Sequence, residues 1–161
     1  MSDPRIITLS TGVCLRVKKI PSILLADIVA KHNPSRPTPP RIFIVSKGRE
    51  EENPDDPEYK ERMGGWQAGL VAAVNNAFLL FGTSVESIPN TIESLESDRW
   101  AQRIRLLGLE TTDNPDARYL AWLKYVGGTE ESDIQLMLSE VGRLSGVAEA
   151  DVQTAVDQFR R

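Results

Sequence analysis

The sequence contains very few of the residues from which most catalytic and metal sites are built. Its 161 residues include one cysteine, Cys14, and one histidine, His32. One cysteine excludes an intrachain disulfide and a cysteine metal cluster, and the sequence places no further metal ligands near His32. We therefore expect no cofactor, no metal, no catalytic residue and no enzymatic activity. A carboxylate or lysine site, which leaves no motif in a sequence, is the enzymatic alternative.

Long apolar segments are missing as well. The most apolar run, Trp66–Phe81, is too short for a bilayer and is interrupted by Gln67, Asn75 and Asn76. The first ten residues lack the basic and apolar regions of a signal peptide. We therefore expect a cytoplasmic protein without a membrane partner.

Charge is unevenly distributed along a chain whose net charge is −4. Residues 1–49 contain nine Lys and Arg against two Asp, whereas residues 50–161 contain ten basic against twenty-one acidic residues. The two parts can attract each other, or the basic part can meet an acidic partner. No nucleic acid is expected, because aromatic residues do not interleave with the basic ones and the whole chain is acidic.

The run Trp66–Phe81 predicts the central core helix. On a period of 3.6 residues its large apolar side chains gather on about half of the circumference. Small and polar residues lie opposite, with Leu79 as the one large exception. A face this wide must be buried. Just before this run, Gly64 and Gly65 should break or kink the helix, because two glycines cost about 2 kcal/mol relative to alanine.

An alternation of apolar and polar residues at the start of the chain predicts a β-hairpin. A two-residue loop would place Ile7 opposite an arginine, whereas a three-residue loop at 10–12 pairs Ile7 with Leu15 on one face. We prefer the longer loop, since it also puts a glycine where a left-handed residue is needed. Cys14 then lies beside Thr8 on the more polar face.

Three segments follow the hairpin. Residues 21–31 predict a helix that begins with a proline in its first turn. Residues 33–40, NPSRPTPP, predict an extended connector similar to polyproline. Residues 41–46 predict a short strand, which can add a third strand beside the hairpin.

Residues 47–62 predict a charged loop that enters a helix. Asp56 is the expected N-cap, because Pro57 follows it at the first helical position. After the core helix comes a polar loop over 82–93, and then short helices separated by turns. The expected N-caps of two of these helices are Asn114 and Thr129. Two further helices are predicted from apolar residues at helical spacing. These residues are Trp100, Ile104 and Leu107 for the first helix, and Val152 and Phe159 for the last.

Together these patterns predict an α+β fold, mainly α, with an N-terminal hairpin of two or three strands followed by about five or six helices. We expect a single domain over 1–161, with hairpin, short helix and extra strand over 1–46, a charged linker and helix entry over 47–65, and a helical part over 66–161. The predicted core residues are Leu9, Leu15, Leu70, Val74, Phe78, Trp122, Leu138 and Phe159.

The later helices carry more large apolar residues than short helices need to cover one face. Any that remain exposed together would form a patch typical of a partner site, and a groove between helices could accept the apolar face of a partner helix. Five leucines lie outside the main apolar stripes, and Leu79 is one of them. The others are the candidate partner-binding residues, Leu106, Leu109, Leu120 and Leu136.

Four stretches follow one another along the chain: STGVCLRVKKIP, KGREEENPDDPEY, RYLAWLKYV, and RLSGV before a final amphipathic segment. In this order they resemble small proteins of tailed bacteriophages, which are found among tail genes and described as tail assembly chaperones or tail-associated proteins. The resemblance covers most of the chain, rests on composition and order, and carries over no functional residue.

The resemblance implies a non-catalytic chaperone in the host cytoplasm. Its partners would be the tape measure protein, whose long apolar helix it keeps soluble, and the tail tube protein. Apart from the resemblance, further copies of the chain itself are another candidate partner. The alternative is a structural virion component of the tail or of the head–tail joining region.

Overall fold

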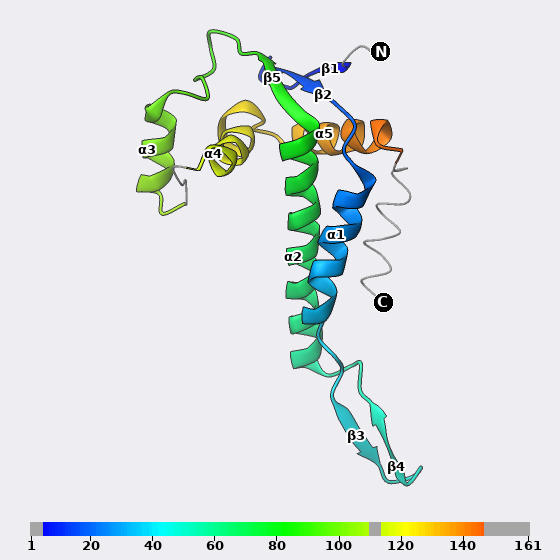
Figure 1. Cartoon of the computed structure of the whole chain (residues 1–161). Coiled ribbons are helices and arrows are strands. Elements are labelled where there is room, and N and C mark those ends of the chain that lie inside the picture. The colour runs from blue at the N-terminus through cyan, green and yellow to red at the C-terminus, as the bar shows by residue number, and fades with distance from the viewer. Residues whose placement is uncertain (1–4, 110–113, 147–161) are drawn as a thin grey trace. The chain divides into compact units, whose positions relative to one another are not determined.

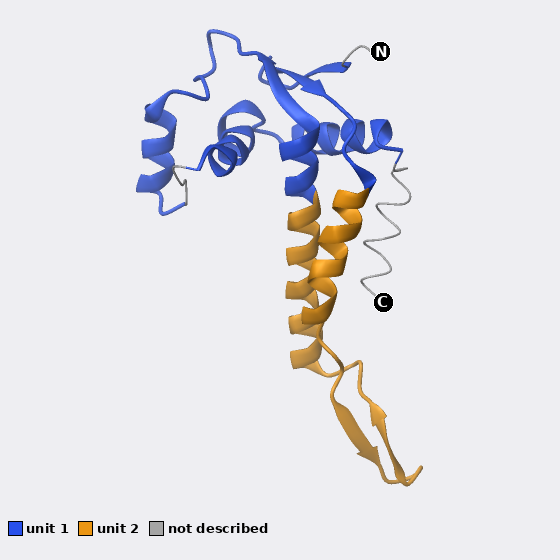
Figure 2. Cartoon of the chain, viewed as in Figure 1, with its two compact units in different colours: residues 1–22, 75–149 blue, residues 23–74, 150–161 orange. Residues whose placement is uncertain are grey.

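The computed structural model describes residues 5–109 and 114–146, and the chain divides into two compact units (Figure 1, Figure 2). Unit 1 comprises residues 1–22 and 75–149, and unit 2 comprises residues 23–74 and 150–161. The described residues form five α-helices, a three-stranded sheet and a two-stranded sheet, which confirms the predicted α+β, mainly α fold. The single domain over 1–161 stays a prediction, and Val152 and Phe159 lie outside the described residues.

Unit 1 contains the three-stranded sheet, in the order β1-β2-β5. Strand β1 (Arg5–Thr8) pairs antiparallel with β2 (Cys14–Val17), and Ile7 lies opposite Leu15 as predicted. The three-residue loop is confirmed, since the Leu9 N–H donates to the Val13 carbonyl at 2.8 Å. Gly12 has φ +91°, the left-handed conformation that this loop requires.

The third strand of this sheet is β5 (Thr83–Ser87), so the prediction that residues 41–46 supply it was wrong. β5 lies in the segment predicted as a polar loop. Its sequence TSVES has one large apolar residue, Val85, which lies opposite Leu15. The strand is set by its place directly after a helix: the Gly82 carbonyl accepts from the Lys18 N–H at 2.9 Å, which starts the pairing with β2.

Three further helices of unit 1 are α3 (Asp98–Leu106), α4 (Pro115–Trp122), which continues as a π-helical turn (Leu123–Gly127), and α5 (Glu131–Leu144). The Asn114 cap is confirmed, because its side chain accepts from the N–H groups of residues 116 and 117. The Thr129 cap was wrong: Glu130 caps α5 and forms a capping box with Asp133. A carboxylate three residues after Glu130 completes that box, which a cap at Thr129 would not allow.

Asp133 also joins α5 to the hairpin loop. Its carboxylate is 4% exposed and accepts from the Ser10 N–H at 2.8 Å and from the Ser10 hydroxyl at 2.6 Å. Beside it, the Thr11 hydroxyl donates to the Gly127 carbonyl at 2.6 Å. A buried carboxylate is tolerated because hydrogen-bond donors replace the water that it has lost.

The core of unit 1 lies between the sheet and the helices. Of the predicted core residues in this unit, Leu138 is half-buried. The others are buried: Leu9, Leu15, Phe78 and Trp122. Gly82 lies so close to Val141 that a Cβ atom at this position would overlap with the valine side chain.

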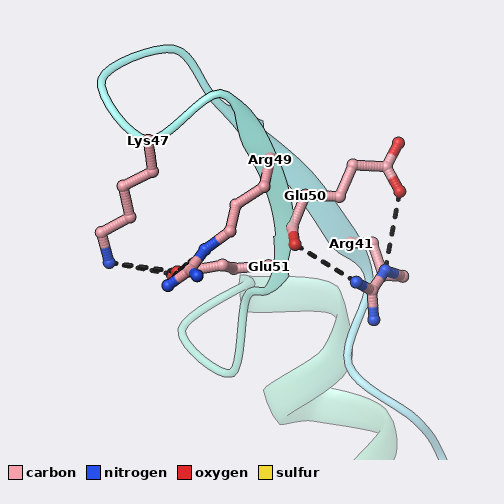
Figure 3. A network of polar contacts seen from close by, with 5 residues as sticks. All are labelled: Arg41, Lys47, Arg49, Glu50 and Glu51. Carbon is pink, nitrogen blue, oxygen red and sulfur yellow. Dashed lines mark hydrogen bonds and ion pairs between the residues drawn. The ribbon is translucent and has the colours of Figure 1, made fainter.

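Unit 2 contains all but the first residue of α1 (Ser22–His32), a 3₁₀ turn (Asn33–Ser35), and strands β3 (Arg41–Ile44) and β4 (Arg49–Glu52). The connector is therefore extended only after Ser35, because a helical turn precedes it. Strand β3 pairs with β4 in a hairpin of its own (Figure 3). β4 was predicted as a charged loop; its glutamates form a strand because arginine and lysine side chains of the hairpin lie beside them.

Helix α2 (Pro57–Gly82) begins in unit 2 and ends in unit 1. The predicted cap is confirmed, since the Asp56 carboxylate accepts from the Tyr59 N–H at 2.9 Å. The break at Gly64 and Gly65 was wrong: both lie within the helix, where the helical segments on either side outweigh the low helix propensity of glycine.

The apolar side of α2 is buried unevenly. Leu70 is buried and Val74 is half-buried, whereas Phe81 is 49% exposed. Leu79, the exception in the sequence pattern, is 7% exposed and belongs to the core. Among the residues that the structure describes, no helix is long and apolar enough to cross a membrane.

Two glycines of α2 should respond oppositely to alanine. At Gly65 an added Cβ would meet nothing within 4 Å, so Gly65→Ala should stabilise the protein by about 1 kcal/mol through helix propensity. Gly82→Ala should destabilise it by about 1–3 kcal/mol, because the methyl group overlaps with Val141. Urea denaturation measures both, and a destabilising Gly65→Ala would contradict the continuous helix.

Asp133→Ala should lower the free energy of unfolding by about 2–3 kcal/mol, since it removes two hydrogen bonds between the hairpin loop and α5 together with the capping box. Glu131→Ala, at an exposed position in the same helical turn, is the control. Equal small losses in both variants would show that the carboxylate does not hold the loop.

Candidate partner-binding surface

Three side chains hold the backbone of residues 93–97, the loop that leads into α3. We call Trp100, Arg118 and Trp122 the carbonyl clamp, because each donates to main-chain carbonyls of this loop. The indole N–H groups of Trp100 and Trp122 donate to residues 94 and 93, at 3.2 and 3.0 Å. The guanidinium of Arg118 donates to residues 95 and 97, at 3.0 and 2.9 Å.

The members of the carbonyl clamp also contact each other and the core. The Arg118 guanidinium lies over the Trp100 ring, 4.9 Å from its centroid. At this distance the positive charge is attracted to the face of the aromatic ring. Trp100 is 3% exposed and Trp122 is fully buried. The clamp therefore fixes the N-terminal half of α3 against α4 (Figure 1). Both helices belong to unit 1 (Figure 2).

The C-terminal end of α3 is closed by its own backbone. The Gly108 N–H donates to the Arg105 carbonyl at 3.0 Å, and the Leu109 N–H donates to the Ile104 carbonyl at 3.2 Å. With φ +77° at Gly108, these bonds form a Schellman turn. The end of the helix thus has backbone hydrogen bonds of its own.

Three leucines surround this turn and are exposed. We call Leu106, Leu107 and Leu109 the leucine tip; their exposed fractions are 86%, 72% and 42%. The same helical turn carries Arg103 and Arg105. The tip is an apolar surface with basic neighbours, held in place at the opposite end of its helix.

The predicted partner residues divide into two groups. Leu106 and Leu109 are exposed and belong to the leucine tip, whereas Leu120 and Leu136 are half-buried. The structure brings the first two together around one turn and does not place the other two in that turn. Whether any of the four binds a partner stays a prediction.

Sequence reasoning missed Leu107 as a surface residue, because it grouped Leu107 with Trp100 and Ile104 as the apolar residues that mark this helix. Leu107 is the C-cap, with φ −80° and ψ 2°, so the helical period no longer decides where its side chain lies. The available signal was the glycine at 108, because a glycine at this position marks the end of a helix and makes the residue before it the C-cap.

Two titratable groups of unit 1 have shifted pKa values. Burial raises the pKa of Tyr119, and a hydrogen bond with Thr83 partly offsets this; the two hydroxyl oxygens are 2.7 Å apart. Hydrogen bonds from Thr8 and Ser87 lower the pKa of the Cys14 thiol. Within residues 5–109 and 114–146, no cluster of three or more His, Cys, Asp or Glu side chains could hold a metal ion.

Comparisons with protein-family models, with curated proteins and with solved structures find no match for this chain.

Arg118→Met should release the loop before α3, because methionine keeps part of the aliphatic stem but cannot donate to the carbonyls of residues 95 and 97. We expect hydrogen exchange over residues 93–106 to be at least about tenfold faster, the equivalent of about 1.4 kcal/mol of local stability. Arg99→Met, at an exposed position of α3, is the control. Unchanged exchange in Arg118→Met would mean that the tryptophans hold the loop without the arginine.

Proposed function

We propose that this protein is a non-catalytic bacteriophage tail assembly chaperone whose leucine tip binds the apolar face of a helix in the tape measure protein. Binding takes place in the host cytoplasm before the tail tube protein assembles around that helix. The resemblance of the sequence to such proteins supplies the biological setting. The observation that carries the proposal is the leucine tip, three large apolar side chains exposed at the end of a helix that is anchored at its other end.

The energetics favour an apolar partner for this surface. Removing a leucine side chain from water contributes about 1.5–3 kcal/mol, and Leu106 and Leu107 are 86% and 72% exposed. Because the carbonyl clamp orders α3 before binding, little conformational entropy is lost when a partner arrives. A helix with apolar residues at i, i+3, i+4 and i+7 offers a matching stripe.

The charges beside the tip are already engaged within unit 1. Arg103, in the last turn of α3, forms an ion pair with Glu93 at 3.3 Å. An exposed ion pair of this kind contributes little to the attraction of a partner. The leucine contacts therefore set the affinity and the lifetime of the complex.

The test is co-expression with the tape measure protein encoded nearby, followed by co-purification. Leu106→Asp combined with Leu107→Asp should weaken binding at least about tenfold, since two carboxylates would lose water in the interface. The matched control is Ile23→Asp, a 69% exposed apolar residue in the first turn of α1, where an acidic residue suits the helix dipole.

Several outcomes would contradict the proposal. One is a tape measure protein that is equally soluble alone and does not co-purify with the chain. Another is equal binding by the double variant and by Ile23→Asp. Mass spectrometry of purified particles separates the chaperone from a structural virion component, because a chaperone leaves before the particle is complete.

A further inference from the structure

The hairpin of β3 and β4 in unit 2 exposes apolar side chains that the leucine tip does not involve. Ile42, Phe43 and Val45 are 45%, 61% and 86% exposed. Phe43 lies opposite Glu50 in the antiparallel register. A two-stranded hairpin is marginally stable in water unless further strands or a helix cover it. The two edges of this hairpin therefore decide what it can bind.

The hydrogen bonds of the hairpin show which backbone groups of β3 face away from β4. The Pro40 carbonyl accepts from the Asn53 N–H at 2.7 Å, and the Ile44 carbonyl accepts from the Gly48 N–H at 2.9 Å. The N–H of a trans peptide points opposite to its carbonyl, so the N–H groups of residues 41 and 45 point outward. By the two-residue period, so do the N–H and carbonyl of Phe43. None of these outward groups has a backbone partner among the described residues.

The outer edge of β4 has different chemistry. Glu50 and Glu52 occupy its outward positions, opposite residues 43 and 41. The Arg41 side chain donates to the Glu50 carbonyl at 3.2 Å and forms an ion pair with its carboxylate at 3.6 Å (Figure 3). Charged side chains on an edge oppose the addition of another strand. Both outward positions of β4 are thus charged, whereas on β3 only Arg41 is, and its side chain is engaged with Glu50 of β4, which leaves the β3 edge the more open of the two.

We propose that the open edge of β3 pairs antiparallel with β3 of a second copy of this chain, centred on Phe43. In this register Phe43 lies opposite Phe43 of the second copy, and the two residues exchange both backbone hydrogen bonds. Ile42 lies opposite Ile44 of the second copy, and Arg41 lies opposite Val45 of the second copy. The inference does not depend on the proposed chaperone role.

The sequence of β3 favours a second copy over another partner, because two antiparallel copies of this strand place like residues opposite each other. The order Ile42, Phe43, Ile44 reads the same in both directions, so a two-fold axis through Phe43 places apolar residues opposite apolar residues. In this register the two Arg41 side chains are four positions apart along the paired strands, so they do not face each other. The glutamates on both outer β4 edges stop further addition, so the sheet closes at four strands.

Sedimentation of the full chain over a range of concentrations tests the proposal. The wild-type chain should move from 17.9 kDa towards twice this mass as concentration rises. Phe43→Pro should raise the dimer dissociation constant at least tenfold, because it removes an outward N–H and the aromatic pair while leaving the ladder to β4 intact. Glu50→Pro is the matched control, as it alters the opposite, outward-facing position on the other edge and should still dimerise.

Cysteine cross-linking tests the register in the full chain. In a Cys14→Ser background, Phe43→Cys should form a disulfide dimer on mild oxidation, because directly opposite residues have Cα atoms about 5.5 Å apart. Val45→Cys, at the more exposed position, should not, because it lies opposite residue 41.

Each other outcome overturns the proposal. A wild-type chain that stays monomeric at every concentration excludes the second copy, and an extended segment of another protein would then be the occupant to seek. If Glu50→Pro dissociates the dimer as strongly as Phe43→Pro does, β4 forms the interface. Equal cross-linking of the two cysteine variants contradicts the register.

Discussion

A buried carboxylate imposes the strongest constraint on unit 1. Asp133 is 4% exposed, and it must find donors for both oxygens because an unpaired charge inside a protein costs several kcal/mol. The donors come from two places far apart in the sequence, the Ser10 loop and the start of α5. Satisfying this one group therefore fixes the hairpin loop, the first turn of α5 and the sheet that continues from the hairpin.

The need to pair buried polar groups also explains how unit 1 supports an exposed surface. The loop at 93–97 has no ladder partners for the carbonyls of residues 93, 94, 95 and 97, which would be costly to bury unpaired. Trp100, Arg118 and Trp122 supply the donors from helices. Because α3 is held at its N-terminal end through this loop, the helix does not depend on its last turn to stay in place. The leucine tip can thus remain exposed without loosening the helix that carries it.

The sequence predicted what depends on local chemistry. The register of the first hairpin, the caps at Asp56 and Asn114, and the helical core run all follow from period, turn residues and side-chain acceptors near in sequence. Prediction from the sequence failed where contacts between residues far apart in the chain determine the secondary structure. β5 has a polar sequence and is a strand because β2 provides an edge for it, while Gly65 stays helical because the helix continues on both sides. Of the candidate site, Leu106 and Leu109 were found and Leu107 was not, since a capping residue leaves the helical period.

The two exposed apolar surfaces differ in the physical basis of their specificity. At the leucine tip, the backbone is satisfied by the Schellman turn, so binding depends on side-chain area and tolerates any helix with a suitable stripe. At the β3 edge, outward N–H and carbonyl groups are open, and they require an extended partner in a defined register. A helix cannot satisfy the second surface, and an extended strand gains little at the first. The chemistry of the two surfaces therefore selects different kinds of segment, an apolar helix face for one and an extended strand for the other.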